Sequence, residues 1–366
     1  MNILILTGKF GMGHWSAAQS LRQHILEEGP HRADVVDFVA YALPGTSEAV
    51  YRSFSLLVTH GSGIYNTYYK MTENLEGEAR PLLERRFLDK LEDLLTARRP
   101  DAIIATHPLC ARLVSRYKWE TGSDIPLVTC ITDLTAHSEW LAHNTDLYLV
   151  GAPDLIGPLC AKGVAQEKIV ATGIPVKGQF QSAPCRQNGE KRSLLIMGGG
   201  LGLLPKKERF YEELNALRDV ETTIIVGTNE KLHQRLAGKY ENIHVLGYTD
   251  RVYDHMARAD LLLSKPGGIT IFEAIATELP ILSWEPLLQQ EINNGHFMTT
   301  KGMGGVAAME LEDCVAVIDD LIHNDGTLAW MAGNMRRLKG SLCQTPVTDL
   351  IFALLSGKEA VSHAGK

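Results

Sequence analysis

Short apolar runs alternate with longer amphipathic stretches along the whole chain, and the alternation predicts two sets of buried parallel strands. The runs of the first set are NILILT, ADVVDF, DAIIAT, PLVTCIT and DLYLVG, and those of the second are SLLIMGG, ETTIIVG, IHVLGY, DLLLSK and LPILSW. Continuous Val, Ile and Leu runs are typical of strands that crossover helices cover on both faces. We therefore predict two doubly wound α/β domains that bind ligands at the carboxyl ends of their strands, with the active site in the cleft between them.

A polar stretch with Gly and Pro, TGIPVKGQFQSAPCRQNGEKR, separates the two sets of strands and marks a linker. We expect an N-terminal domain over residues 1–172, a linker over 173–192 and a C-terminal domain over 193–342. The remaining residues, 343–366, begin as an apolar helix that can cross back to the first domain. A chain of 366 residues is longer than one hydrophobic core usually serves, which agrees with two domains.

The segment from Ala49 to Leu75 departs from this alternation. It is rich in Tyr, Phe, Leu and Val but is interrupted by His60-Gly61-Ser62-Gly63, and basic residues follow at 80, 85, 86, 90, 98 and 99. Aromatic and apolar side chains next to Lys and Arg suit the surface of an anionic membrane. A helix pair packed into the core with a solvated flank is the alternative, and the pattern does not separate the two.

Composition and charge narrow the class of protein. The net charge of -7 argues against a general nucleic-acid binder, which neutralises phosphates with Lys and Arg. The six cysteines lie far apart, which favours reduced thiols in the cytoplasm over disulfides or a zinc site. No run approaches the roughly 18 apolar residues of a membrane span, and MNILILTG lacks the features of a signal peptide. We expect a cytoplasmic protein, peripheral on the inner face of the cell membrane.

The first strand leads into a glycine loop, GKFGMGHWSAA. The dinucleotide fingerprint G-x-G-x-x-G places Ser16 where its third glycine should stand, and the frame from Gly8 has the wrong spacing. Asp37 follows the second apolar run, at the place of a ribose-binding acid. The fingerprint is therefore incomplete, and the histidine within the loop, His14, is either a turn or core residue or a group that carries chemistry.

A second glycine turn, SKPGGITIFEA, follows the strand DLLLS in the second domain. The turn at Gly267 and Gly268 leads into a helix that we expect to begin near Thr270, and the positive end of a helix dipole suits a phosphate. Glu273 lies about one turn into that helix, where its carboxylate could hold a pair of sugar hydroxyls. A structural turn without a ligand is the alternative.

In combination, these segments resemble the lipid-glycosylating branch of glycosyltransferase family 28, the monogalactosyldiacylglycerol synthases and processive diacylglycerol glucosyltransferases. The resemblance rests on GKFGMGHWSAA, THPL, ITDLTAHSEW, TGIPV, MGGGLG, VLGYTD and SKPGGITIFEA in this order, and it covers nearly the whole chain. It implies a GT-B fold of two Rossmann-like domains, with a lipid acceptor on the first and a nucleotide sugar on the second.

The resemblance implies an inverting transfer, for which an acceptor hydroxyl needs a base. His14 is that base or lies beside it, since a histidine has a pKa near neutrality. Asp133 is either an orienting carboxylate or a competing base. His137 and Trp140 match the spacing T-D-x-x-x-H-x-x-W and are placed on the acceptor side; a packing cluster after the strand is the alternative.

The resemblance also assigns the donor side. Gly198, Gly199 and Gly200 form a loop that can approach a diphosphate closely. Gly267, Gly268 and Thr270 complete the cradle, Lys265 adds a cation, Glu273 binds the ribose and the segment at Tyr248 faces the uracil. The remaining donor-side residues are Gly13, Gly227, Gln290, Glu291 and Asn294.

The donor sugar and the acceptor stay open. Gln290, Glu291 and Asn294 keep the register of the family's P-G-Q-E-x-x-N segment, but Gln289 replaces its glycine and two leucines follow Pro286. We therefore expect either UDP-glucose or UDP-galactose, which differ in one hydroxyl orientation. The expected acceptor is diacylglycerol or a glycosyl-diacylglycerol. The donor is a substrate, so no cofactor is expected, and magnesium is at most a stimulant of binding.

Other functions predict other features. Within the class, the chain could transfer N-acetylglucosamine to a lipid-linked saccharide. A nucleotide-sugar 2-epimerase would share the fold without needing the aromatic segment, and a nicotinamide-dependent dehydrogenase would need glycine at position 16 and no SKPGG turn. A protein that binds lipid and sugar nucleotide without turnover would not need both His14 and Glu273.

Overall fold

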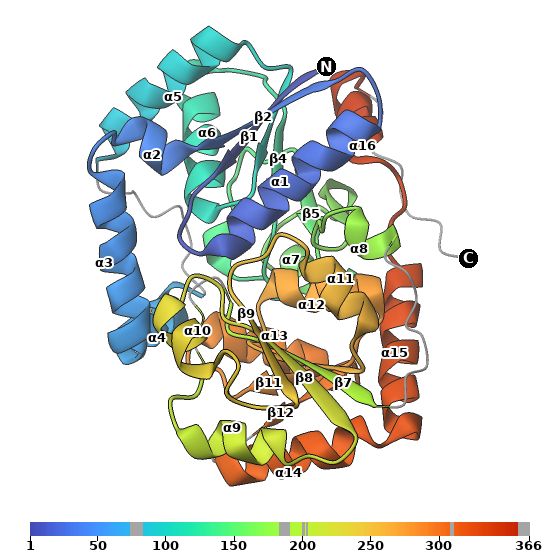
Figure 1. The fold of residues 1–366 in the computed structure, drawn as a ribbon. Helices are drawn as coiled ribbons and strands as arrows, with labels where there is room; N and C mark the ends of the chain where they lie inside the picture. The colour runs from blue at the N-terminus through green and yellow to red at the C-terminus, as the bar shows by residue number, and fades with distance from the viewer. Residues whose placement is uncertain (74–82, 183–190, 200–201, 203, 308–310, 358–366) are drawn as a thin grey trace. The chain divides into compact units, whose positions relative to one another are not determined.

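The computed structural model describes residues 1–73, 83–182, 191–199, 202, 204–307 and 311–357, apart from the side chains of His60, Leu311 and Glu312. The chain forms two compact units. Unit 1 consists of Met1–Gly178 and Ser341–Lys366, and unit 2 consists of Gln179–Gly340. Each unit is built on its own six-stranded parallel sheet (Figure 1).

The sheet of unit 1 has the strand order β2-β1-β3-β4-β5-β6, with every neighbouring pair parallel. Its strands are β1 (Asn2–Thr7), β2 (Arg32–Asp37), β3 (Ala102–Ala105), β4 (Leu127–Cys130), β5 (Leu147–Val150) and β6 (Ile169–Ala171). The chain first builds β2 on one side of β1 and then returns to add β3 on the other. This reversal lies between β1 and β3, and a parallel sheet binds ligands where its strand order reverses.

The helices of unit 1 cover both faces of this sheet (Figure 1). They are α1 (Met12–Glu27), α2 (Phe38–Ala42), α3 (Ser47–His60), α4 (Ser62–Thr72), α5 (Glu84–Arg98), α6 (Pro108–Thr121), η1 (Ser138–Trp140), η2 (Pro153–Leu155), α7 (Ile156–Ala161), η3 (Gln166–Lys168) and α16 (Val347–Leu355).

Alternate residues of the central strands enter two separate cores. Leu4 and Leu6 of β1 pack with α2, α5 and α6, whereas Ile3 and Ile5 pack with α1 and α16. Successive side chains of a strand point to opposite faces, so a strand buried on both sides must be apolar throughout. The unbroken apolar runs of the sequence follow from this arrangement.

The C-terminal segment is part of unit 1. The backbone N–H of Cys343 donates to Ala171 O at the end of β6. Glu28, just after α1, accepts from the backbone N–H and the hydroxyl of Thr348 at 3.1 and 2.7 Å. A carboxylate at the first turn of α16 complements the helix dipole and fastens this helix beside α1.

The sheet of unit 2 has the order β12-β11-β10-β7-β8-β9 and is also entirely parallel. Its strands are β7 (Arg192–Met197), β8 (Val220–Ile225), β9 (Ile243–Leu246), β10 (Leu261–Ser264), β11 (Ile281–Trp284) and β12 (Gly304–Ala307). The strand order reverses between β7 and β10. The ends of these two strands are in register, because Met197 pairs with Ser264.

The helices of unit 2 again form two layers. They are α8 (Gln179–Ser182), α9 (Glu208–Asn215), α10 (Glu230–Leu236), α11 (Val252–Arg258), α12 (Gly268–Thr277), α13 (Gln289–Thr300), α14 (Leu311–Ile322) and α15 (Asp325–Gly340). Helices α9, α10 and α14 share one core with the sheet. Helix α12 packs against α11, α13 and α15.

All ten predicted strands are confirmed, and the structure adds β6 and β12 at the sheet edges. β12 escaped prediction because it begins with two glycines, which weaken a strand pattern. Gly304 is required there: a Cβ at this position would lie 2.1 Å from Ile281 O of the neighbouring strand. Helix α12 begins at Gly268, two residues before the predicted start at Thr270.

Candidate functional site

The candidate site of unit 1 lies where the strand order reverses. His14 is the third residue of α1, which follows β1, and His107 directly precedes α6 after β3. Thr132 and Asp133 follow β4 in the next strand position. Because parallel strands end at the same edge of the sheet, these side chains gather at one place.

His14 is held by contacts from the segments that follow β3 and β4. Its Nδ1 lies 2.8 Å from Thr132 Oγ1, and its backbone oxygen accepts from the hydroxyl of Thr106. The ring of His107 meets it edge to face with a centroid distance of 4.7 Å, and the indole of Trp140 lies at 5.9 Å. The sequence predicted that His14 lies in the glycine loop after the first strand; it lies instead within the first turn of the helix.

Burial lowers the pKa of His14 to about 4, although a hydrogen bond to the backbone of Thr106 acts in the opposite direction. Burial also lowers the pKa of His107 well below its usual value, and the neighbouring His14 adds to this effect. Both imidazoles are therefore neutral at pH 7. A neutral imidazole has a lone pair that can accept a proton.

Asp133 does not contact His14 by any hydrogen bond among the described residues. Its Oδ2 accepts from the indole N–H of Trp140 at 3.1 Å, and Trp140 is only 1% exposed. Burial raises the pKa of Asp133, while the hydrogen bond from Trp140 and the nearby His137 lower it. The residue beside the imidazole of His14 is thus Thr132, to which no sequence motif gave a role.

His137 connects the loop after β4 to helix α4. Its Nδ1 accepts from the backbone N–H of Glu139, so the proton is on Nε2, which donates to Tyr69 O at 2.9 Å. The His137 ring also stacks on the ring of Tyr69 with centroids 3.9 Å apart. Both ring nitrogens are therefore used inside the fold, which is the pattern expected of a packing residue.

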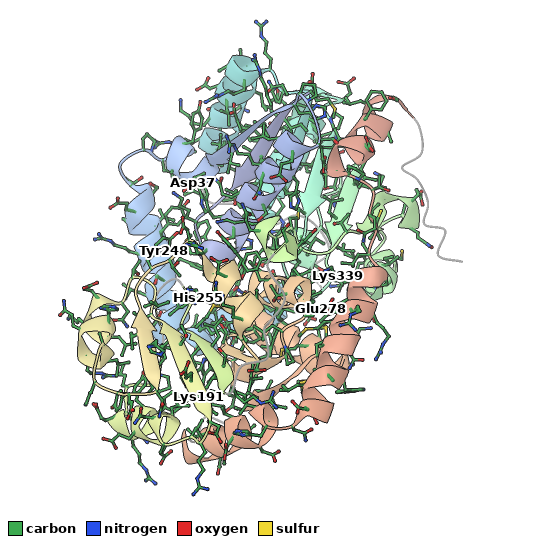
Figure 2. All side chains as sticks on the ribbon, turned by 45° about the vertical axis from the view of Figure 1, so that its right-hand side comes forward. Asp37, Lys191, Tyr248, His255, Glu278 and Lys339 are labelled. Carbon is green, nitrogen blue, oxygen red and sulfur yellow. The ribbon has the colours of Figure 1, made fainter. Side chains whose placement is uncertain are left out.

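Asp37, labelled in Figure 2, has local partners. Its Oδ1 accepts from the backbone N–H of Ala40 at the start of α2 and from the hydroxyl of Tyr51. Tyr51 in turn accepts from the backbone N–H of Lys9 in the glycine loop at 3.2 Å. Asp37 thus links β2 and α3 to that loop, which explains an acid at this position without a bound ribose.

Helices α3 and α4 carry apolar side chains on their outer surface. Leu56, Ile64, Tyr68 and Met71 are 61%, 70%, 51% and 72% exposed. The described basic residues that follow on α5 are largely paired with acids: Arg85 with Asp89 and Glu120, Lys90 with Asp93, and Arg98 with Asp34. The surface of this helix pair, which we call the α3–α4 hairpin, is thus apolar more than it is cationic.

The candidate site of unit 2 lies at the reversal between β7 and β10. Gly198 and Gly199 follow β7, and Lys265, Gly267 and Gly268 follow β10. The hydroxyl of Ser264 donates to Met197 O and ties the two strand ends together. The structure therefore brings the two predicted glycine segments side by side; Gly200 lies outside the described residues.

The glycines of this site differ in what the fold requires of them. Gly199 and Gly227 have φ of +67° and +57°, which disfavour other residues. A Cβ on Gly202 would lie 2.0 Å from Val226 O, so only glycine fits there. In contrast, Gly267 has φ of -71°, and a Cβ built on it would meet only Thr270 Oγ1, at 3.8 Å.

The backbone N–H groups at this edge are not equally available. Gly198 donates to Ile225 O and Gly267 donates to Lys265 O, so both N–H groups are used within the fold. The first turn of α12 begins at Gly268 and includes Thr270; N–H groups in a first turn have no partner within their own helix. These groups form the donor end of the helix dipole.

The predicted charged residues come from α12, α13 and the turn between β10 and α12. Lys265 Nζ lies 3.3 Å from Glu291 Oε1, so the cation is already balanced by an acid. Glu273 is partly buried on the second turn of α12. Gln290 and Asn294 are four residues apart on α13 and therefore share a helix face, with Asn294 buried.

Two predicted donor-side residues belong to other elements than these. Tyr248, in the loop after β9, is 71% exposed (Figure 2). Gly13 is an exposed residue of α1 in unit 1.

In the part of the chain that the structure describes, no group of three or more His, Cys, Asp or Glu side chains could hold a metal ion. None of the described helices is long and apolar enough to cross a membrane.

Solved structures share this architecture over nearly the whole chain. MurG of Acinetobacter baumannii is 14% identical, with 97% of this chain and 99% of that chain covered and a TM-score of 0.66. The spinosyn rhamnosyltransferase SpnG is 15% identical with coverage of 98% and 100% and a TM-score of 0.61. UDP-GlcNAc 2-epimerase from Neisseria meningitidis is 16% identical, with coverage of 98% and 100% and a TM-score of 0.58. The fold is GT-B, as the sequence predicted.

The sequence itself matches two family models. Residues 14–176 match monogalactosyldiacylglycerol (MGDG) synthase, and residues 193–335 match the glycosyltransferase family 28 C-terminal domain. The chain belongs to glycosyltransferase family 28, which confirms the resemblance found in its motifs.

Two curated relatives align with most of the chain. The processive diacylglycerol beta-glucosyltransferase of Bacillus cereus (strain AH187) is 27% identical over 367 residues, covering 96% of this chain and 93% of the relative. The protein of the same name from Staphylococcus carnosus (strain TM300) is 28% identical over 352 residues, covering 92% and 88%.

Proposed function

We propose that the chain is an inverting glycosyltransferase that transfers a hexose from UDP-glucose or UDP-galactose to diacylglycerol, or to a glycosyl-diacylglycerol, at a membrane surface. The observation that carries the proposal is the neutral His14 at the strand reversal of a family 28 chain. The names of the aligned relatives support a diacylglycerol acceptor and a glucosyl donor. Because the segment around Gln289 departs from the family's pattern, UDP-galactose stays an alternative donor.

In the proposed reaction, His14 acts on the acceptor. The imidazole accepts the proton of the acceptor hydroxyl as its oxygen forms a bond to the anomeric carbon. The bond from that carbon to the β-phosphate oxygen breaks, and UDP leaves with the bonding electrons. The low pKa of His14 keeps the ring unprotonated before the reaction.

The proposed donor site is the β7–β10 reversal of unit 2. The first turn of α12 directs N–H groups and the positive end of a dipole at the diphosphate. Gly267 supports this role. The fold leaves room for a Cβ at this position, so the glycine is explained by a ligand that the Cβ would obstruct rather than by a neighbouring residue. Glu291 holds Lys265 near this turn, and Glu273 is assigned to the ribose hydroxyls. The proposed reaction requires no metal.

The proposed membrane contact is the α3–α4 hairpin, on the cytoplasmic side of the cell membrane. Its exposed Leu56, Ile64, Tyr68 and Met71 can enter the boundary between headgroups and acyl chains. The ion pairs of α5 reduce the positive charge available beside it. Binding should therefore depend on apolar burial more than on anionic lipid.

A nucleotide-sugar 2-epimerase is the second candidate, because a UDP-GlcNAc 2-epimerase has the same fold over nearly the whole chain. The discriminating experiment incubates the full chain with diacylglycerol liposomes and UDP-glucose, UDP-galactose or UDP-GlcNAc, with magnesium or with EDTA. Lipids and nucleotides are then analysed by mass spectrometry and chromatography. The proposal predicts a hexosyl lipid in both metal conditions. An epimerised nucleotide sugar without a glycolipid would favour the alternative.

A further inference from the structure

We propose that His107 is an acceptor-binding residue whose Nε2–H donates a hydrogen bond to an uncharged oxygen of the acceptor, next to the hydroxyl that attacks. This inference rests on the proposed function and adds a second acceptor contact beside His14. No motif assignment made from the sequence gave His107 a role.

His107 has the position that such a contact requires. It is the N-cap of α6 and follows β3 after one intervening residue, and β3 is the strand beside β1 at the reversal of unit 1. Its ring lies 4.7 Å from the ring of His14, and Phe10 packs against it with centroids 5.0 Å apart. An acceptor hydroxyl bound at His14 would therefore bring its neighbouring oxygen atoms close to His107.

The hydrogen bonds of His107 fix its tautomer. Nδ1 accepts from the backbone N–H of Leu109 at 3.2 Å, which caps the helix. In a neutral imidazole the proton is then on Nε2, which is a donor. Among the described residues, Nε2 has no hydrogen-bond partner. It is also absent from the set of unpartnered side-chain atoms that are fully buried, so it is accessible. This N–H is accordingly open to a ligand.

The surroundings also indicate the kind of atom that it binds. Burial and the adjacent His14 keep His107 neutral, so it offers a hydrogen bond without a charge. An ester oxygen of diacylglycerol or a hydroxyl of a glycosyl-diacylglycerol would fit, since both lie next to the attacking hydroxyl. Each is an uncharged acceptor, and the two sources are separated by assaying both acceptors.

Two substitutions separate binding from helix capping. Asn at position 107 keeps an oxygen that can cap α6 but has no donor at the place of Nε2. Gln reaches further and carries an N–H near that place. We expect His107→Asn to keep the wild-type Tm and the KM for the UDP-sugar. Its kcat/KM for dioctanoylglycerol should fall about 10-fold, the cost of one lost hydrogen bond, and His107→Gln should recover most of this loss.

His244→Asn, on the exposed face of β9 in unit 2, is the matched control and should leave every parameter unchanged. The inference is overturned if His107→Asn retains the wild-type kcat/KM for dioctanoylglycerol and for its monoglucosylated form. It is also overturned if Asn and Gln lower activity and Tm alike, which would indicate a structural cap.

A binding measurement separates this inference from the proposed function. In protein labelled with 15N-histidine, dioctanoylglycerol should shift the His107 Nε2 resonance without any UDP-sugar. A wild-type protein that shows this shift but forms no glycolipid would contradict the proposed function alone. A protein that forms glycolipid without the shift would contradict the role of His107 alone.

Discussion

Thr132 Oγ1 lies 2.8 Å from Nδ1 of His14, so a hydroxyl from the loop after β4 orients the imidazole on α1. Thr132 is 4% exposed, which holds this contact away from competing water. We expect Thr132→Val to lower kcat about 10-fold by releasing the ring, with the donor KM unchanged. Thr132→Ser keeps the hydroxyl and should retain most activity. Equal rates for the Val variant and the wild type would show that Thr132 does not position the proposed base.

The low pKa of His14 makes stability depend on pH. In the unfolded chain the imidazole titrates near 6.5, whereas in the folded chain burial lowers its pKa to about 4. The unfolded state therefore binds more protons between these values, and the contribution of the neutral ring is complete above 6.5 and is lost as the pH falls towards 4. The Tm should fall more between pH 7 and pH 5 in the wild type than in His14→Gln. An equal fall in both proteins would contradict this assignment.

The same substitution tests catalysis. His14→Gln removes the group that accepts the proton in the proposed reaction, so we expect kcat to fall by about 100-fold or more while UDP affinity stays the same. Calorimetric titration with UDP and a transfer assay measure the two effects. Full transfer activity in this variant would exclude His14 as the base and direct attention to Asp133.

His137 is predicted to be structural. It is 1% exposed, and replacement by Leu leaves Tyr69 O and the Glu139 N–H without their partner. Each buried group left unpaired costs about 1–3 kcal/mol, so His137→Leu should lower the Tm and open α4 to limited proteolysis. His244→Asn serves as the control. A stable variant that loses activity would instead place His137 in contact with substrate.

The α3–α4 hairpin should dominate liposome binding. Ile64 and Met71 are 70% and 72% exposed, and replacing both with Ser removes apolar area that would enter the bilayer. Sedimentation with neutral liposomes should show binding weaker by at least about 10-fold. The control Leu26→Ser with Val317→Ser removes exposed apolar side chains from α1 and α14 and should bind like the wild type. Equally weak liposome binding by both double variants would show that the α3–α4 hairpin is not the membrane contact.

Gly267 and Gly202 should respond differently to alanine. The backbone at Gly267 accommodates a Cβ, so Gly267→Ala should keep the Tm but raise the KM for the UDP-sugar about 10-fold by obstructing the diphosphate. Gly202 has φ of +60° and no space for a Cβ, so Gly202→Ala should lower the Tm. An unchanged KM in the Gly267 variant would place the diphosphate elsewhere.

The apolar runs were sufficient to predict ten strands and the fold, because a buried parallel strand must be apolar on both faces. The edge strand β12 was missed because it begins with two glycines, and the glycine at 304 follows from close approach to a neighbouring strand rather than from a hydrophobic pattern. Backbone proximity of this kind depends on sheet register, which the sequence does not display. The start of α12 at Gly268 was also missed, because a glycine gives no sequence signal that it lies inside a helix.

Sequence motifs located the candidate sites but not all of their contacts. His14 and the SKPGG turn were found because each follows a strand, and the structure places each at a strand reversal. His107 and Thr132 also follow strands, and THPL and ITDLT contained them. Their relation to His14 spans 93 and 118 positions along the chain and arises only from strand order, so motif spacing could not reveal it.

The most direct test of the proposed transfer is the structure of the lipid product formed from diacylglycerol liposomes and a UDP-α-hexose. Mass spectrometry and proton NMR of the extracted lipid measure the added mass and the anomeric configuration. Inverting transfer predicts a diacylglycerol that is heavier by one hexose residue, or by several, joined through β-linkages. A lipid of unchanged mass with every UDP-hexose, or an α-linked product, would contradict inverting transfer by this chain.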